Sequence, residues 1–276
     1  METWRLIIDE KPSNGATNMA RDEAILKSVS KEEVPPTIRF YFWDPPCVSM
    51  GYFQKAERQI DFEVSKKLGF DYVRRPTGGR AILHKDELTY SVIVNEQNPK
   101  IPDEVIKAYK VLSRGLMYGL DEMGIRAEMN ELKNGSGKKQ GSAACFDAPS
   151  WYELLVEDKK VIGSAQVRKY GALLQHGSIP IKINIEELIS VLNFPSEKVR
   201  ERTKKTLKNR AAGLADVAKT KNIDITQDNL IKVFKKGFES ALDIKLEQGT
   251  LTEGEKLFVS ELEKTKYLKD KWNLKR

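Results

Sequence analysis

The side chain best suited to covalent chemistry is the thiol of Cys145, in CFDAPSWYEL (145–154). It closely follows a polar, Gly-rich stretch at 131–142, which we expect to form a flexible loop. Loops on rigid scaffolds are frequent positions for nucleophiles, but a free cysteine is more often a small buried apolar residue. Position alone leaves both interpretations of Cys145 open. The other cysteine, Cys47, lies in an apolar run where burial is favoured.

Cys145 needs an activating group, because the thiolate is the reactive form of the side chain. With a pKa near 8.5, only about 3% of a thiol is ionised at pH 7. Half ionisation requires a pKa lower by about 1.5, or roughly 2 kcal/mol, and a neighbouring ammonium can supply this. Lys159 and Lys160 follow 14 and 15 residues later. Simple hairpin pairing brings neither of them opposite Cys145, so the sequence offers lysines without their geometry.

A second candidate is RRPTGGR (74–80), in which three arginines surround a Gly-Gly turn. Backbone N–H and guanidinium groups could hold a phosphate or a carbonyl oxygen there. A tight turn with solvated charges is an equal alternative. His84 and His176 could be acid–base groups, although a lone histidine in a strand is more often structural.

The pattern of apolar residues predicts the elements that must position these groups. Helices are predicted over 17–30, 59–68 and 103–123, and strands over 37–43, 47–53, 70–76 and 172–183. A hairpin is expected over 150–169 and mainly helix from about 185, with a β-like stretch near 244–247 and capping-box spacing at Thr252 and Glu255. Strands mixed with helices, without regular βα alternation, favour an α/β or α+β fold with mixed or antiparallel sheets flanked by helices.

Composition fits one sizeable domain, since the chain has 276 residues with 40% hydrophobic and 32% charged. No stretch approaches the roughly 20 apolar residues of a membrane span. METWRLIIDEKPSNG lacks the basic start and apolar core of a signal peptide, so we expect a soluble, cytoplasmic protein. The two cysteines and two histidines lack metal-ligand spacing, which disfavours a metal site, and a disulfide is improbable in such a chain.

The charge balance favours acidic partners, because 47 basic and 40 acidic residues give a formal charge of +7. Nucleic acid and a small acidic carrier protein are both candidates. The segment 197–210 holds seven basic and two acidic side chains, which is either a docking face or, more simply, a solvated helix face. No aromatic residues are interleaved with these charges, so base stacking has little support.

Three segments together resemble the lipoate–protein ligase and octanoyltransferase superfamily. They are RRPTGGRAILHKDELTYS (74–91), CFDAPSWYEL (145–154) and KVIGSAQVRKYGALLQHGSI (160–179), and the resemblance extends over essentially the whole chain. It implies the catalytic fold shared by biotin and lipoate protein ligases, an α/β domain with mixed sheets. We place this acyltransferase domain at 1–250, with 251–276 as a helical extension of the same domain.

The resemblance also implies an activity. Members of this type move octanoyl from octanoyl-acyl carrier protein to the lysine of a lipoyl domain during lipoate biosynthesis, and glycine cleavage H protein is the expected acceptor. Cys145 matches the cysteine that carries the acyl thioester. Lys160, not Lys159, matches the lysine that lowers the pKa of this thiol. The residues expected to line the acyl pocket are Arg75, Thr77, Gly78, Gly79, Arg80, His84, Gly163, Ser164, His176 and Gly177.

We expect no cofactor, no metal, no nucleic-acid partner and no membrane association, and we expect a monomer. Two enzymatic alternatives stay open: an ATP-dependent lipoate–protein ligase that uses the same lysine, and an amidotransferase between lipoyl domains. A non-enzyme alternative is an acyl acceptor, since VEDKK (156–160) has a lysine near a hairpin tip, but the chain is too long and helical for that small module. The last is a basic nucleic-acid-binding protein, supported by charge alone.

Overall fold

The computed structural model describes the chain except for residues 132–151, 220–222, 224 and 276. The strands are β1 (Glu2–Ile8), β2 (Thr37–Tyr41), β3 (Cys47–Met50), β4 (Asp71–Arg74), β5 (Ile82–His84), β6 (Glu87–Asn95), β7 (Glu128–Glu131), β8 (Tyr152–Val156), β9 (Lys159–Lys169), β10 (Ala172–Pro180) and β11 (Ile244–Gln248). Within this part of the chain, eight of them form one sheet in the order β11-β1-β2-β6-β10-β9-β8-β7, and β4-β3-β5 form a second.

Both sheets are mixed. In the large sheet β1 pairs in parallel with β2 and β11, whereas β6, β10, β9, β8 and β7 follow in antiparallel pairs. In the small sheet β3 is parallel to β4 and antiparallel to β5. The predicted fold class, α/β with mixed sheets flanked by helices, is confirmed.

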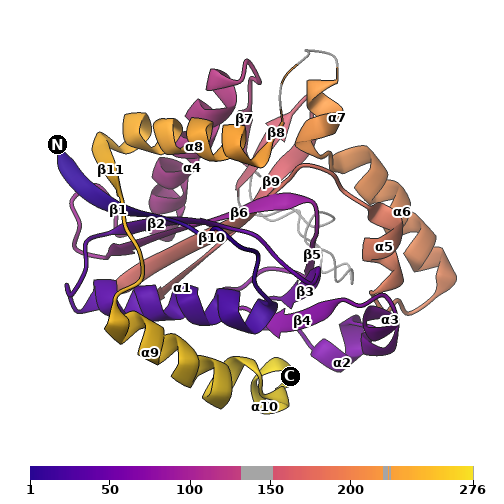
Figure 1. Cartoon of the computed structure of the whole chain (residues 1–276). Coiled ribbons are helices and arrows are strands. Elements are labelled where there is room, and N and C mark those ends of the chain that lie inside the picture. The colour runs from indigo at the N-terminus through magenta and orange to yellow at the C-terminus, as the bar shows by residue number, and fades with distance from the viewer. Residues whose placement is uncertain (132–151, 220–222, 224, 276) are drawn as a thin grey trace.

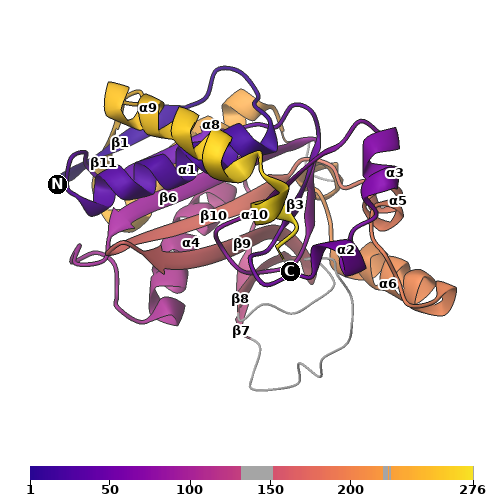
Figure 2. The ribbon, with the colours of Figure 1, turned by 90° about the horizontal axis from the view of Figure 1, so that it is seen from below.

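Helices cover both faces of the large sheet (Figures 1 and 2). They are α1 (Gly15–Ser30), α2 (Ala56–Gln59), α3 (Phe62–Lys67), α4 (Val105–Glu122), α5 (Ile185–Ser190), α6 (Glu197–Arg210), α7 (Leu214–Ala218), α8 (Gln227–Leu242), α9 (Glu253–Leu262) and α10 (Asp270–Asn273), with a π-helical turn η2 (Glu263–Tyr267) after α9. Helices α4 and α8 pack together on one face, whereas α1 covers the other and is itself covered by α9.

Side-chain alternation along β2 separates an apolar face from a polar one. Ile38 and Phe40 join the core beneath α4 and α8, while Arg39 and Tyr41 point to the α1 side, where their polar groups bond to that helix. Close packing of α4 on α8 depends on small residues at the crossing: a Cβ at Gly115 would lie 2.2 Å from Cδ1 of Phe238. This crossing fixes α4, whose N-terminal turn borders the cavity described below.

Several predicted elements are confirmed, among them the helix over 17–30, the hairpin after 150 and the strand near 244–247. The capping box of Thr252 and Glu255 is present at the start of α9. The first helix is capped by Asn14, whose side chain accepts from the backbone N–H of Thr17 at 2.8 Å. The loop predicted over 131–142 lies, apart from its first residue, outside the described residues.

The prediction of one helix over 59–68 is wrong. Helix α2 ends at Gln59, Ile60 is extended, and α3 begins at Phe62. The reason is Asp61, whose carboxylate accepts from the backbone N–H of Val64 at 2.9 Å. An aspartate that satisfies the free N–H groups of a following turn starts a new helix instead of continuing the old one.

The C-terminal segment is fastened to α1 through the buried carboxylate of Glu23. It accepts hydrogen bonds from Tyr267 at 2.5 Å and from Lys169 at 2.9 Å, and it pairs with Lys266. Burial alone would raise the pKa of Glu23, but the Lys266 ammonium and these hydrogen bonds hold it at about 2, below the ordinary 4.5.

The division of the chain into 1–250 and an extension of the same domain stays a prediction.

We predict that Glu23 makes the protein sensitive to acid. Because its folded pKa lies below its unfolded pKa, its contribution is complete above about pH 4.5 and is lost as the pH falls to about 2. The difference between these values corresponds to about 3 kcal/mol. Burial also lowers the pKa of its partner Lys266 below the ordinary value.

Urea unfolding of wild type and Glu23→Gln between pH 6 and pH 2 measures this contribution. The difference in unfolding free energy should shrink by about 3 kcal/mol across that range. Glu10→Gln, at an exposed glutamate outside this contact, is the matched control and should show no comparable change over this range. A pH-independent difference for Glu23→Gln would contradict the assignment.

Candidate active site

A cavity of about 510 Å³ lies between the start of α4, the β9–β10 hairpin and the segment from Arg75 to His84. Its apolar wall includes Met19, Ile82 and Tyr109. The structure brings Lys160 and nine of the ten predicted pocket residues to this cavity: Arg75, Gly78, Gly79, Arg80, His84, Gly163, Ser164, His176 and Gly177. The tenth, Thr77, is fully buried and hydrogen-bonded to His176 in the wall.

His176 links Asp22 to Thr77. Its Nδ1 lies 3.1 Å from Oδ2 of Asp22, and its Nε2 lies 2.7 Å from Oγ1 of Thr77. Burial lowers the pKa of His176 despite the opposing effect of Asp22, so the ring is neutral at pH 7. A neutral ring with Nδ1–H donating to the carboxylate accepts the Thr77 hydroxyl at Nε2. Both nitrogens are thereby occupied, which makes His176 a group that positions the turn after Thr77 rather than an acid–base group.

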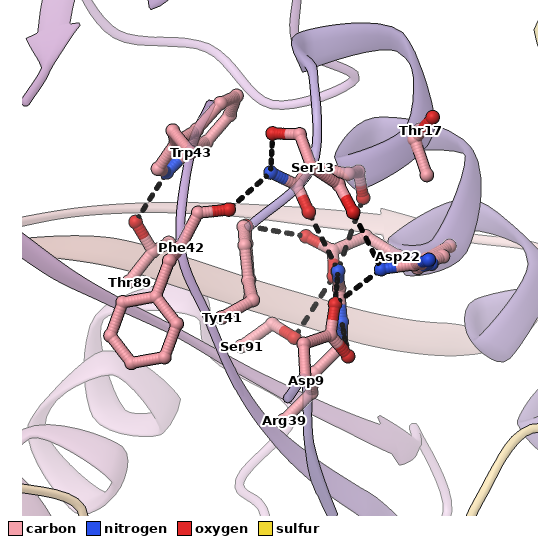
Figure 3. Close-up of polar contacts among 12 residues, drawn as sticks. Asp9, Ser13, Thr17, Asp22, Arg39, Tyr41, Phe42, Trp43, Thr89 and Ser91 are labelled. Carbon is pink, nitrogen blue, oxygen red and sulfur yellow. Dashed lines mark hydrogen bonds and ion pairs between the residues drawn. The ribbon is translucent and has the colours of Figure 1, made fainter. Parts of the chain in front are cut away.

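Asp22 is the centre of a buried polar cluster (Figure 3). Its carboxylate accepts from Arg39 at 2.8 Å, from Ser91 at 3.0 Å and from Tyr41 at 3.1 Å, in addition to His176. Burial would raise the pKa of Asp22, but the bond from His176 and the charge of Arg39 outweigh it and hold that pKa below its ordinary value. Helix α1 and strands β2, β6 and β10 are therefore joined at one anion.

A second chain of hydrogen bonds runs through His84. Its Nδ1 lies 2.7 Å from Oε1 of Glu87, and its Nε2 lies 2.6 Å from Oγ of Ser49, which also accepts from Arg75 at 2.6 Å. The Trp43 ring stacks on His84 with centroids 4.0 Å apart. As with His176, both ring nitrogens have partners, so His84 is built into the wall.

Two of the three arginines of 74–80 are buried rather than solvated. Arg74 is fully buried and donates to backbone carbonyls, among them that of Gly51 at 3.0 Å. Arg75 is also buried, and its Nη2 donates to the carbonyls of Gly78 and Arg80 at 3.1 and 3.0 Å. These two guanidinium groups hold the turn itself rather than lying in solvent. Only Arg80 keeps a half-exposed position.

Glycines are needed where the turn meets its neighbours. Gly79 has φ of +95°, in the left-handed region that other residues rarely adopt. A Cβ at Gly51 would lie 2.0 Å from the carbonyl oxygen of Gly79, so only glycine lets the turn approach β3. On the opposite wall Ser164 of β9 pairs with Gly177 of β10. The predicted pocket residues Gly163 and Ser164 therefore lie beside the predicted pocket residues His176 and Gly177 of the neighbouring strand.

Lys160 is 2% exposed, and its Nζ donates to Oε1 of Glu153 at 3.1 Å. The pairing of β8 with β9 shifts register between Leu154 and Leu155. The backbone carbonyl of Lys160 accepts from the N–H of Ala212 at 3.1 Å. A buried ammonium is tolerated because a carboxylate faces it. Cys145 lies outside the described residues, so its proximity to Lys160 stays a prediction.

Sequence reasoning missed three buried carboxylates that build this site: Asp22, Glu87 and Glu153. Glu153 lies inside the quoted motif CFDAPSWYEL, and a charged residue within a predicted strand was a usable indication. In β6 the polar side chains of Glu87, Thr89 and Ser91 alternate with apolar ones, which is the period expected of a two-faced strand. Asp22 gives no local indication, because its partners are distant in sequence.

Comparison with known proteins agrees with this geometry. Residues 14–239 match the lipoyl protein ligase A/B catalytic domain. Octanoyltransferase LipM from Brevibacillus brevis is 48% identical over 280 residues, covering 100% of both chains. Octanoyltransferase LipM from Bacillus subtilis is 46% identical, covering 100% of this chain and 99% of the other. The bi-partite lipoate protein ligase structure from Thermoplasma acidophilum is similar with a TM-score of 0.81 and 28% identity, covering 99% of this chain and 97% of that one.

The chain belongs to the lipoyl protein ligase A/B catalytic domain family and, within it, to the octanoyltransferase LipM group. The resemblance seen in the three sequence segments is confirmed. No helix in the described ranges is both long and apolar enough to cross a bilayer. The same ranges contain no group of three or more His, Cys, Asp or Glu side chains placed to hold a metal ion.

We predict that the Thr77 hydroxyl stabilises the turn through His176. Thr77→Val keeps the shape of the side chain but leaves the buried Nε2 of His176 without this donor, which should lower the unfolding free energy by about 1–3 kcal/mol. Thr265→Val, at an exposed threonine of η2, is the control and should stay within about 0.5 kcal/mol of wild type. Equal effects of the two substitutions in urea unfolding would contradict this role.

Proposed function

We propose that the protein transfers octanoyl from octanoyl-acyl carrier protein to the lysine of a lipoyl domain, with glycine cleavage H protein as the expected acceptor. Membership of the octanoyltransferase LipM group makes it an acyltransferase of lipoate biosynthesis. The observation that carries the proposal is the buried Lys160 in the wall of a cavity of about 510 Å³, a size typical of small-molecule sites. An acyl chain fits against the apolar wall of the cavity. The Lys160 ammonium at its edge would stabilise a nearby thiolate by its positive charge.

In the first proposed step the Cys145 thiolate attacks the carbonyl of the carrier thioester. A new C–S bond forms on Cys145, the bond to the carrier's sulfur breaks, and the carrier thiol leaves with the proton that Cys145 gave up. Lys160 favours the thiolate by its positive charge. Glu153 holds Lys160 in place by their 3.1 Å contact and so keeps that charge at the cavity.

In the second proposed step the acceptor lysine, as free amine, attacks the thioester of the acyl-enzyme. A C–N bond forms, the Cys145 thiol is released and the lysine loses a proton. The exchange of one thioester for another is nearly balanced, and the amide is the stable product, so no ATP is consumed. Backbone N–H groups of the turn at Gly78 and Gly79 are our candidates to stabilise the oxyanion.

A second candidate function is that of an ATP-dependent ligase, which is favoured by the similarity to the Thermoplasma acidophilum lipoate protein ligase structure. The two functions differ in the acyl donor that they use and in whether they need ATP. A transferase acylates an apo lipoyl domain from octanoyl-acyl carrier protein alone, whereas a ligase needs ATP and free octanoate. Acylation only in the second mixture would favour the ligase. The amidotransferase alternative differs from both in taking octanoyl from another lipoyl domain.

Cys145→Ala should abolish both transfer and the acyl-enzyme, because no other group is proposed to hold the acyl chain. Intact mass after mixing with octanoyl-acyl carrier protein, without ATP, measures the adduct. Cys47→Ser is the matched control: Cys47 is fully buried, burial raises its pKa well above the ordinary value, and its removal should leave activity largely intact. An octanoyl adduct on Cys145→Ala, or none on wild type, would refute the intermediate.

Lys160→Met should raise the apparent pKa of Cys145 by about 1–2, since an opposite charge nearby lowers a pKa by about that amount. The rate of iodoacetamide alkylation against pH gives this pKa directly. Combining Lys160→Met with Glu153→Gln avoids leaving a buried carboxylate without its ion pair, and should give the same result. Lys159→Met, at the exposed neighbouring lysine, is the control and should leave the profile unchanged. An unshifted profile for both Lys160 variants would rule out its role.

A further inference from the structure

Most of the net charge of the chain resides on one helix. Helix α6 carries seven basic and two acidic side chains, a net +5 out of the formal +7. The other 262 residues contain 40 basic and 38 acidic side chains and are close to neutral. Figure 1 places α6 at the edge of the molecule beside α5. A local excess of this kind attracts acidic partners more strongly than the same charge spread evenly.

The outward face of α6 is predominantly basic. Lys198, Arg202 and Lys205 are spaced at i, i+4 and i+7, which aligns them along one side of a helix, and all three are exposed. Glu201, which is also exposed, lies beside them at i+3 from Lys198, so this side carries three positive charges and one negative charge. We call these three residues the α6 stripe.

The opposite side of α6 packs against the rest of the protein. Thr203 and Leu207 are buried beneath the helix. Lys204 and Lys208 pair with Glu186 of α5 at 2.6 and 3.3 Å, so that carboxylate neutralises part of the lateral charge. These contacts fix which side of α6 faces outward, and the α6 stripe lies on that outward side.

The α6 stripe is connected to the site without being part of the cavity wall. The end of α6 runs into Ala211 and Ala212, and the N–H of Ala212 donates to the carbonyl of Lys160 at 3.1 Å. Among the described residues, none from α6 lines the cavity. The helix is therefore held by the strand that carries Lys160, while its charged side lies outside the pocket.

We infer that the α6 stripe docks the acyl-donor carrier protein through acidic side chains on that protein; this inference rests on the proposed function. A carrier presents its acyl group at the end of a long phosphopantetheine arm, so its docking surface can lie away from the reacting atoms. The acceptor must bring its own short lysine side chain to the thioester, and its domain therefore needs the cavity mouth. A charged surface outside the cavity suits the first partner.

Charge also identifies the kind of contact. Exposed ion pairs mainly accelerate encounter, and the acceleration decreases as salt screens them. Single-stranded nucleic acid, the other polyanion, is usually held by aromatic side chains between the basic ones, and α6 contains none. The observations therefore favour an acidic protein.

The test separates the donor half-reaction from the rest. In the variant Lys198→Glu, Arg202→Glu and Lys205→Glu, acyl-enzyme formation from octanoyl-acyl carrier protein should slow by about 10-fold or more at low salt. The difference from wild type should shrink as salt rises. Acyl-enzyme formation from octanoyl-pantetheine, which carries the same thioester without a protein, should be unchanged and also reports that the variant is folded.

Lys232→Glu, Lys245→Glu and Lys256→Glu together form the control, since they change the charge equally at exposed lysines of α8, β11 and α9. An equal slowing in both triple variants would overturn the inference. A loss confined to transfer from preformed octanoyl-enzyme to the lipoyl domain would overturn it too, by assigning the α6 stripe to the acceptor. Stripe-dependent oligonucleotide binding at physiological salt, with donor kinetics unchanged, would likewise overturn it. If wild type forms no acyl-enzyme from either donor, it is the proposed function that fails.

Discussion

The carboxylate of Asp22 is the contact on which the geometry of the cavity depends. A charge removed from water costs several kcal/mol unless partners replace the solvent. Arg39, Tyr41, Ser91 and His176 supply those partners from three strands, and each must keep its position for the anion to remain satisfied. The hydrogen bonds to the Asp22 carboxylate therefore hold β2, β6 and β10 against α1. His176 extends this contact to Thr77, where the turn begins.

The same principle recurs on each side of the cavity. Glu87 fixes the ring of His84, and Glu153 holds the ammonium of Lys160. Both ring nitrogens of each histidine are hydrogen-bonded within the wall. The two histidines therefore position the wall rather than transfer protons. This leaves Lys160 as the cation of the cavity with the clearest chemical use, in line with a mechanism that charges a sulfur and needs no separate base to do so.

Much of the architecture could be predicted because it follows from local rules. Periodicity located α1 and α4, and the capping box located α9. The family resemblance selected residues that border the cavity, which composition could not do. The buried carboxylates were not predicted, because an aspartate that anchors a core looks the same in sequence as one in solvent. Asp22 and His176 are separated by 154 residues, so only the folded chain relates them. A single helix over 59–68 would place Asp61 in its interior, whereas its side chain caps the start of α3 and so separates α2 from α3.

In the proposed reaction the acyl group passes through a thioester on Cys145 on its way to the acceptor. A single-turnover experiment follows it most directly: enzyme is mixed with octanoyl-acyl carrier protein without ATP, then chased with apo lipoyl domain, and both proteins are digested and weighed at each time. The octanoyl mass should appear first on the peptide containing Cys145 and then move to the acceptor lysine at the rate of turnover. Acceptor modification that precedes any enzyme adduct, or that requires ATP, would contradict the claim.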